Sequence, residues 1–271
     1  MHELALFAGG AGGLLGTKWL LGWRTACYVE FNAYCVEVLK ARIRDRLLDD
    51  APIWDDVRTF DGAPWRGSVD IITAGFPCQP FSAAGKRRAG DDERNRWPDT
   101  IRIIREVEPE WVFLENVPAL LWGSHGYFGQ IQKDLAESGF NDRWDCIPAS
   151  AVGANHQRDR LWVVAHAARN VFVGQGASDQ DARLGPASSG QGQPGASAYT
   201  QQMAYPDKGG RGWDTRRQAG QESENGRWWA AEPGLGRVAN GVADRVDRIR
   251  ASGQGQVPAV VAAVWRLLAA R

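Results

Sequence analysis

Short apolar runs alternate with amphipathic stretches over the first 166 residues, and no other feature of the sequence restricts the possible folds as strongly. We expect strands over residues 3–8, 25–30, 69–74, 111–114 and 161–165. We expect helices that follow them, one ending near Leu21 and others over residues 33–44, 98–107, 128–137 and 259–269. The run 69–74 is mostly apolar, with Asp70 and Thr73 as its polar members, and it resembles strands buried on both faces of a parallel sheet. The alternation predicts a doubly wound α/β fold with a mostly parallel sheet.

Composition narrows the class of protein. A chain of 271 residues that is 44% hydrophobic can bury a substantial core. It has no run of about 18 apolar residues, so we expect no membrane span. Its first residues lack the basic start and cleavage site of a signal peptide, so we expect an intracellular protein. The 32 basic and 32 acidic side chains balance, so any basic surface for nucleic acid must be local.

The cysteines form no metal-binding or disulfide pattern. Cys27, Cys35, Cys78 and Cys146 include no Cys-x-x-Cys pair, and the chain has only four histidines. We therefore expect no structural zinc site and no disulfide framework. Three of the four, all except Cys78, fit the common role of a small buried hydrophobic residue.

The composition changes near residue 167, which divides the chain into three predicted parts. Residues 1–166 form the main domain. Residues 167–235 form a small, loop-rich region, because glycine, glutamine and serine replace the apolar residues that a core requires. Over residues 167–230 the region has seven basic and six acidic side chains, so it is not a strongly basic tail. Residues 236–271 return to the main domain through a helix that Pro258 can open.

A glycine-rich loop follows the first strand. Gly9-Gly10-Ala11-Gly12-Gly13 leads into a helix, and Glu30 ends the second strand 18 residues after Gly12. This is the layout of a nucleoside-binding βαβ unit, in which the acid binds ribose hydroxyls. The dinucleotide pattern G-x-G-x-x-G fails, because Leu15 takes its sixth position. The loop therefore favours an adenosine cofactor without a pyrophosphate over a nicotinamide or flavin, and a plain tight turn is the alternative.

Three further sites fall at strand ends. The loop Gly75 to Ser82 places Cys78 between two prolines, which stiffen it, and a rigid loop at the carboxyl edge of the sheet suits a nucleophile. Glu115-Asn116-Val117 follows the next strand, where the glutamate can act as a proton donor. Arg158-Asp159-Arg160 precedes the last strand, and its two arginines can meet anionic groups. Each site alone also fits a structural role: a stiff turn, a capping acid or a surface ion pair.

In combination and in this order, these segments resemble the motifs of DNA cytosine-5 methyltransferases, above all the compact phage and bacterial members. The segments that carry the resemblance are Phe7 to Gly13, Glu30, Gly75 to Ser82, Glu115 to Val117 and Arg158 to Arg160. It covers about residues 3–166 and resumes near 236–270. It implies the Rossmann-like fold of S-adenosylmethionine-dependent methyltransferases, with residues 167–235 in the place of the target-recognition domain.

The resemblance also implies the chemistry. The cysteine matching Cys78 attacks carbon 6 of a flipped cytosine, Glu115 contacts ring nitrogen 3 and the exocyclic amine, and Arg158 and Arg160 help to hold the base. The implied cofactor is S-adenosylmethionine. The residues expected to bind it are Phe7, Gly9, Gly12, Gly13, Glu30, Phe31, Asp56, Val57, Pro77 and Gln254.

The resemblance further implies double-stranded DNA as the partner, a monomer, no metal, and a place in the cytoplasm of a bacterial or phage-infected cell, within restriction-modification. The residues expected to contact the DNA are Gln79, Ser82, Asn116, Arg211, Arg216 and Arg217.

Several positions depart from the family pattern. The glycine loop has one residue more than usual, His156 replaces a glutamine, Gln254 replaces an asparagine, and Arg96 stands where an apolar residue is common. Three alternatives therefore remain. They are an RNA (tRNA) cytosine-5 methyltransferase of the same architecture, a catalytically decayed DNA-binding homologue, and a nicotinamide-dependent oxidoreductase. The last leaves Pro77-Cys78-Gln79 unexplained.

Overall fold

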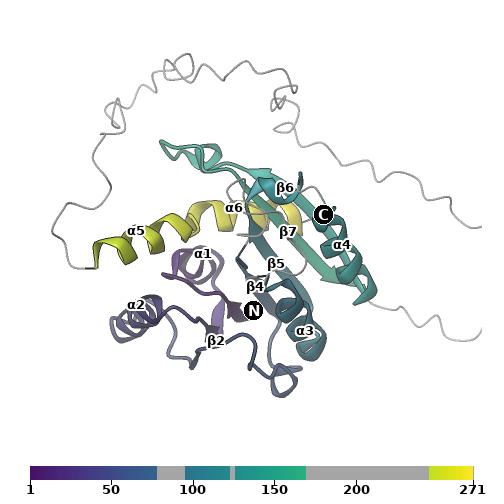
Figure 1. The fold of residues 1–271 in the computed structure, drawn as a ribbon, viewed down its shortest axis with the longest axis horizontal. Helices are drawn as coiled ribbons and strands as arrows, with labels where there is room; N and C mark the ends of the chain where they lie inside the picture. The colour runs from purple at the N-terminus through teal and green to yellow at the C-terminus, as the bar shows by residue number, and fades with distance from the viewer. Residues whose placement is uncertain (78–94, 123–125, 169–243, 271) are drawn as a thin grey trace, which may run out of the picture. The chain divides into compact units, whose positions relative to one another are not determined.

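The computed structural model describes residues 1–77, 95–122, 126–168 and 244–270, which all belong to one compact unit of the chain. Its strands form a single sheet in the order β3-β2-β1-β4-β5-β7-β6 (Figure 1). The strands are β1 (His2–Leu6), β2 (Arg24–Val29), β3 (Ile53–Trp54), β4 (Ile71–Ala74), β5 (Trp111–Asn116), β6 (Phe140–Ile147) and β7 (Arg160–Ala167).

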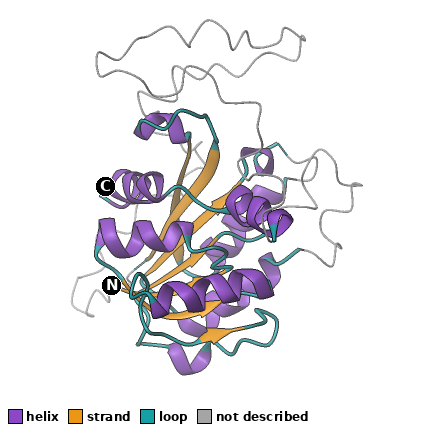
Figure 2. Ribbon diagram, turned by 90° about the vertical axis from the view of Figure 1, so that its left-hand side faces the viewer, coloured by secondary structure: helices purple, strands orange, loops and turns teal. Residues whose placement is uncertain are grey.

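Helices flank this sheet on both faces, as Figure 2 shows. The α-helices are α1 (Gly12–Leu21), α2 (Ala33–Arg44), α3 (Trp97–Val107), α4 (Tyr127–Glu137), α5 (Arg245–Gln254) and α6 (Pro258–Ala269). Short 3-10 turns are η1 (Ala63–Trp65), η3 (Pro118–Leu120) and η4 (Ala149–Val152). The predicted doubly wound α/β fold is confirmed.

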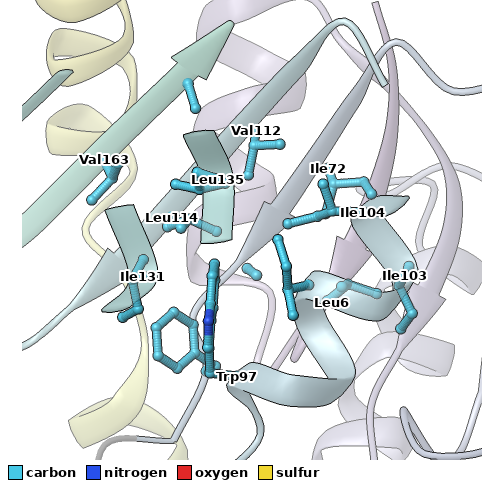
Figure 3. Close-up of a cluster of buried hydrophobic side chains, with 14 of the residues drawn as sticks. Leu6, Ile72, Trp97, Ile103, Ile104, Val112, Leu114, Ile131, Leu135 and Val163 are labelled. Carbon is cyan, nitrogen blue, oxygen red and sulfur yellow. The ribbon is translucent and has the colours of Figure 1, made fainter. Parts of the chain in front are cut away.

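Alternation along the strands sends successive side chains to opposite faces, and each face has its own core. Leu6, Ile72 and Val112 point to the face covered by α3 and α4, where they pack with Trp97 and Leu135 (Figure 3). On the opposite face, α1 and α2 cover one end of the sheet and α6 covers the other. The buried residues there include Ala5, Tyr28, Phe113, Trp162 and Val261. The strands are apolar on both faces because both faces are covered.

The helix starts follow the predicted signals. The Asn32 side chain accepts a hydrogen bond from Cys35 N at 3.1 Å and caps α2. Pro98 and Pro258 occupy the first turns of α3 and α6, where proline has no hydrogen bond to lose. Helix α5 was not predicted.

The last strands differ from the prediction. β7 pairs with β5 in the antiparallel direction, and β6, which was not predicted, pairs with β7 in the same way. β5 also extends two residues further than predicted, so Glu115 and Asn116 are its last residues rather than the start of a loop. The start of β7 therefore lies beside the end of β5, at the edge where the parallel strands β1, β4 and β5 also end.

None of the helices in the described part of the chain is long and apolar enough to span a membrane. The described residues also contain no cluster of histidine, cysteine, aspartate and glutamate that could hold a metal ion.

A buried polar network lies under α1. Glu3 on β1 is 1% exposed and accepts hydrogen bonds from Thr17 Oγ1 at 2.7 Å and from Thr73 Oγ1 at 2.6 Å. Burial raises the pKa of the Glu3 carboxyl to about 7, because water no longer stabilises its charged form.

This raised pKa predicts how stability depends on pH. The folded protein keeps the Glu3 proton up to about pH 7, whereas the unfolded chain loses it near pH 4.5, so the free energy of unfolding should fall as the pH rises between these values. The expected loss is about 3 kcal/mol. Glu3→Gln keeps an acceptor for the threonines and should flatten the dependence in urea unfolding between pH 4.5 and 7.5. The exposed control Glu37→Gln should retain it, and a slope in Glu3→Gln equal to that of the unchanged protein would contradict the prediction.

Candidate functional site

A pocket of about 540 Å³ opens at the carboxyl edge of the sheet. A pocket of this size suits a small-molecule ligand, and this edge is where open α/β sheets bind ligands. Most of the predicted cofactor residues line it: Phe7, Gly9, Glu30, Phe31, Asp56, Val57, Pro77 and Gln254. Glu115, Asn116 and Arg160 line the same pocket, so the predicted catalytic and cofactor groups meet there.

The glycine loop is fixed to the end of β2 by a carboxylate. Glu30 Oε2 accepts a hydrogen bond from Gly9 N, and Glu30 Oε1 accepts one from Asn32 N, each at 2.7 Å. Phe7 and Ala11 have φ values of 57° and 71°, a left-handed conformation that costs side-chain-bearing residues free energy. Each Glu30 oxygen keeps a lone pair for further donors, such as ribose hydroxyls.

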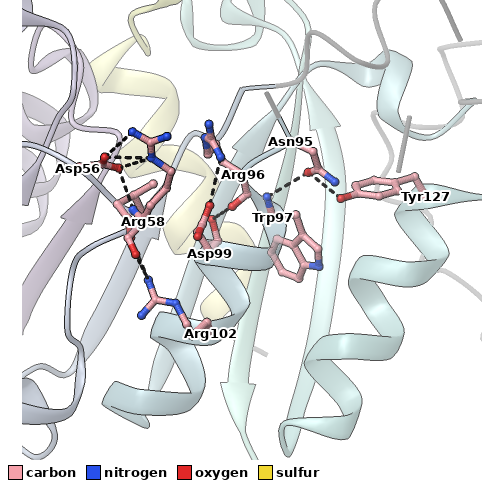
Figure 4. Close-up of polar contacts among 10 residues, drawn as sticks. Asp56, Arg58, Asn95, Arg96, Trp97, Asp99, Arg102 and Tyr127 are labelled. Atoms are coloured by element: carbon pink, nitrogen blue, oxygen red, sulfur yellow. Dashed lines mark hydrogen bonds and ion pairs between the residues drawn. The ribbon is translucent and has the colours of Figure 1, made fainter. Parts of the chain in front are cut away.

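The other end of the pocket carries an aromatic and charged cluster. Phe31 is 75% exposed, and the Arg58 guanidinium lies 6.0 Å from the centre of its ring. Arg58 also grips Asp56, with Nη2 donating to Oδ2 at 2.6 Å (Figure 4), and these bonds hold the pKa of Asp56 below its usual range. Arg102 on α3 donates to Val57 O at 2.9 Å and fixes this turn. Asp56 was predicted to bind the cofactor, and in this structure its carboxylate is hydrogen-bonded to Arg58.

Glu115 is the most constrained acid of the pocket. It is 9% exposed, and its Oε1 lies 2.8 Å from Arg160 Nε. Burial raises the pKa of Glu115 above the ordinary glutamate value, and the positive charges of Arg160 and Arg158 oppose part of that rise. A partly buried acid with a raised pKa beside a fixed cation can hold a proton and deliver it to a ligand.

Asn116 anchors the loop that leads to Cys78. Its Nδ2 donates to Phe76 O at 3.2 Å, and its Oδ1 accepts from Val117 N at 2.9 Å. Its predicted contact with DNA stays a prediction, and within the chain its side chain bonds to these backbone groups.

The chain re-enters the described structure at Asn95, close to the point where it left. Asn95 Oδ1 accepts hydrogen bonds from Trp97 N at 3.1 Å and Tyr127 Oη at 2.8 Å (Figure 4). The rings of Phe76 and Trp97 lie 5.4 Å apart. Both ends of the segment that contains Cys78 are therefore held at the rim of the pocket.

Arg158 and Arg160 were predicted to meet anionic groups and to help hold the base, and within the chain they have different partners. Arg158 Nη2 donates to Gly253 O at 2.8 Å and also to Gly255 O. It thereby fastens residues 253–257, which we call the closing segment and which run from the last two residues of α5 to the residue before α6. Arg160 alone reaches Glu115.

Gly12 and Gly13 lie against the closing segment. A Cβ on Gly12 would lie 2.5 Å from Gln256 O, and a Cβ on Gly13 would overlap the Gln256 side chain. These two glycines are needed because the closing segment packs directly against them. They also line a second cavity, which shares Gly9, Gly75 and Glu115 with the pocket, and their contact with a cofactor stays a prediction.

Several predicted residues lie outside the described residues: Cys78, Gln79, Ser82, Arg211, Arg216 and Arg217. Sequence reasoning missed Arg58, which no motif marks, and Gln256, for which the sole signal was its place in the closing segment. Two of the described cysteines, Cys27 and Cys35, do not suit nucleophilic attack. Burial raises the pKa of the Cys27 and Cys35 thiols to about 11, so both stay neutral, although Cys35 reaches the pocket.

Comparison with known sequences agrees with this arrangement. Residues 1–189 match the profile of the family described as C-5 cytosine-specific DNA methylase. Type II methyltransferase M.CviJI of Paramecium bursaria Chlorella virus IL3A is 36% identical over 169 residues, which is 60% of this chain and 42% of that protein. Type II methyltransferase M.NgoMIV of Neisseria gonorrhoeae is 32% identical over 168 residues, 60% of this chain and 51% of that protein. The chain therefore matches about half the length of these relatives.

Solved structures share the fold. The crystal structure of a Spodoptera frugiperda DNMT2 variant superposes with a TM-score of 0.51 at 20% identity, over 66% of this chain and 53% of that one. The S. pombe Dnmt2 methyltransferase gives a TM-score of 0.51 at 17% identity, over 62% of this chain and 51% of that one.

The packing of the closing segment predicts the effect of filling a glycine. Gly12→Ala forces a Cβ against the Gln256 backbone, so it should lower the free energy of unfolding by about 1–3 kcal/mol. The control is Gly129→Ala on α4, where a Cβ meets nothing within 4 Å. That change should stabilise the protein by about 0.5–1 kcal/mol. Equal stability of the two variants in urea unfolding would contradict the proposed packing.

Proposed function

Because the chain belongs to the C-5 cytosine-specific DNA methylase family, we propose that it transfers a methyl group from S-adenosylmethionine to carbon 5 of cytosine in double-stranded DNA. One observation carries the proposal. Glu115, paired with Arg160, and Glu30, paired with the glycine loop, line one pocket at the sheet edge that the Cys78 loop leaves. In the proposed function, Glu115 binds the target base and Glu30 binds the ribose of the cofactor, so the two ligands would meet in this pocket.

The pocket fits the cofactor in its chemistry. Glu30 offers acceptors for two ribose hydroxyls, while Phe31 and Val57 provide apolar surface for a flat base. When bound, S-adenosylmethionine supplies an electrophilic methyl group. We propose that Asp56 accepts a hydrogen bond from the adenine amine of the cofactor. Its two oxygens already accept hydrogen bonds from Arg58, so they would have to serve both donors.

The chain's own residues supply the activation of cytosine. Carbon 5 of cytosine is a weak nucleophile, and we infer that the Cys78 thiolate adds to carbon 6 to form an enamine-like ring. Glu115 then holds a proton at ring nitrogen 3 and accepts a hydrogen bond from the exocyclic amine, which offsets the charge of the adduct. After methyl transfer, loss of the carbon-5 proton to a base expels Cys78 as a thiolate.

The target base has to leave the duplex to reach this pocket, because a stacked cytosine exposes neither carbon 6 nor nitrogen 3 to protein groups. We assign recognition of the DNA sequence to residues 167–235, including Arg211, Arg216 and Arg217, on the resemblance and composition alone. The remaining alternatives are tRNA as substrate and a decayed enzyme that still binds DNA.

One assay separates these alternatives. Duplex DNA of mixed sequence and unmodified tRNA are incubated with the full chain and S-adenosylmethionine, and bisulfite sequencing locates 5-methylcytosine in each. We expect methylation of cytosines in a fixed context in the duplex and none in tRNA. Methylation of tRNA alone would assign the RNA substrate, and DNA binding without methylation would identify a decayed enzyme.

The covalent step makes a prediction about Cys78. Cys78→Ser removes the acidic thiol that forms the nucleophile, so methyl transfer to duplex DNA should fall on the order of a thousandfold or more. Binding of S-adenosylmethionine, measured by calorimetry, should change little. Cys35→Ser is the matched control, because the Cys35 thiol stays neutral, and it should retain most activity. Transfer by Cys78→Ser at the original rate would refute the proposed nucleophile.

A further inference from the structure

The closing segment lies at the centre of the site although it comes from the far end of the chain. Arg158 holds two of its carbonyl groups, those of Gly253 and Gly255. Its backbone presses against the glycine loop so closely that Gly12 has no room for a Cβ. Gly253 and Gln254 line the cofactor pocket. Further along the same segment, the Gln256 side chain lies beside Gly13 and Gly75, at the carboxyl edge of the sheet.

Gln256 reaches across to the buried acid. Its Nε2 lies 3.5 Å from Glu115 Oε2 and donates to it, while its Oε1 lies over Gly13. Both atoms lie beside Gly75, where an added Cβ would be 3.2 Å from Gln256 Nε2 and 3.2 Å from Glu115 Oε2. The Gln256 amide is thus held between the glycine loop and the end of β4, with its donor directed at Glu115.

The two oxygens of Glu115 therefore have different partners. Arg160 Nε contacts Oε1 at 2.8 Å, and Gln256 Nε2 contacts Oε2. Among the residues that the structure describes, these are the donors that reach the carboxyl group. A cation fixed on one oxygen and a neutral donor fixed on the other together hold the plane of the carboxyl group in one orientation. A side chain that served packing alone would not need to direct a donor at Glu115.

We propose that Gln256 is a positioning residue for Glu115, holding Oε2 so that the carboxyl group presents its plane to the target cytosine. The inference rests on the proposed function and goes beyond it, because it makes the closing segment part of the base-activating apparatus as well as of the cofactor pocket. Arg158 serves the same end indirectly, since it holds the backbone on either side of Gln254.

The hydrogen bond from Gln256 should have a measurable effect on the pKa of Glu115. The Gln256 amide and the charges of Arg160 and Arg158 favour the ionised carboxylate, against the effect of burial. Gln256→Met keeps the side-chain length and removes the donor, so the pKa of Glu115 should rise. Gln256→Glu adds a like charge at the same place, so the pKa should rise further.

The test is a ¹³C NMR titration of glutamate carboxyl groups in the full chain without ligand, with Glu115→Gln to assign the signal. The matched control is Gln254→Met, a change from the same residue type two positions earlier. It should leave the Glu115 titration at the wild-type midpoint. We expect the midpoint to increase in the order wild type, Gln256→Met, Gln256→Glu. A Gln256→Met midpoint equal to that of wild type would overturn the proposal.

A kinetic readout separates this role from cofactor binding. In Gln256→Met, kcat for duplex DNA should fall on the order of tenfold while the KM for S-adenosylmethionine changes little, since the loss of one hydrogen bond to a charged group is of that size. The limb of the pH–rate profile that reports Glu115 should move to higher pH. Gln254→Met should instead raise that KM.

The two proposals fail in different ways. If the wild-type chain methylates no nucleic acid, the proposed function fails, and the titration still decides whether Gln256 holds Glu115. If the titration midpoint does not move, or the KM rises while kcat is unchanged, the positioning role fails and the proposed function stands.

Discussion

A carboxylate that is 9% exposed at the wall of a pocket is costly to keep ionised, and the contact between Glu115 and Arg160 offsets part of that cost. Removing a charge from water costs several kcal/mol unless a partner of opposite charge is fixed beside it. The geometry that supplies the partner is the reversal of β7, because it brings the start of that strand to the end of β5. Burial therefore raises the pKa of this acid at the ligand-binding edge, and the ion pair that the strand direction allows opposes part of that rise.

The sequence predicted the parallel strands that form this edge better than it predicted the antiparallel pairing of β6 and β7 beside them. Apolar runs and glycine signals located β1, β2, β4, β5 and β7 within a few residues, because both faces of these strands are buried and the pattern is strong. Strand β6 was missed because it lies at the edge of the sheet and its sequence, Phe140–Ile147, mixes charged residues with apolar ones. When β6 is missed, no nearby sequence feature indicates that β7 is antiparallel to β5. In an all-parallel sheet Arg160 would lie at the opposite edge from Glu115, so the family resemblance, rather than strand geometry, placed them together.

The glycines illustrate a second limit of sequence reasoning. A glycine in the sequence can indicate that there is no room for a Cβ, but it does not indicate which residue fills that space. Gly9 lies in the pocket wall as predicted, whereas Gly12 and Gly13 make room for Gln256, which is more than 240 residues away along the chain. The same holds for Asp56, whose partner Arg58 lies two residues on and is marked by no motif. Contacts of this kind are set by tertiary packing, so only the folded chain reveals them.

The central claim is that this edge activates cytosine through a covalent bond to Cys78. The most direct measurement uses duplex DNA in which the target cytosine carries fluorine at carbon 5, so that no proton can be lost after methyl transfer and the adduct persists. Incubation with the full chain and S-adenosylmethionine, followed by denaturing electrophoresis and peptide mass spectrometry, should give a denaturation-resistant complex with the DNA attached at Cys78. Methylation of ordinary duplex DNA without a trapped complex, or attachment at another residue, would contradict the account.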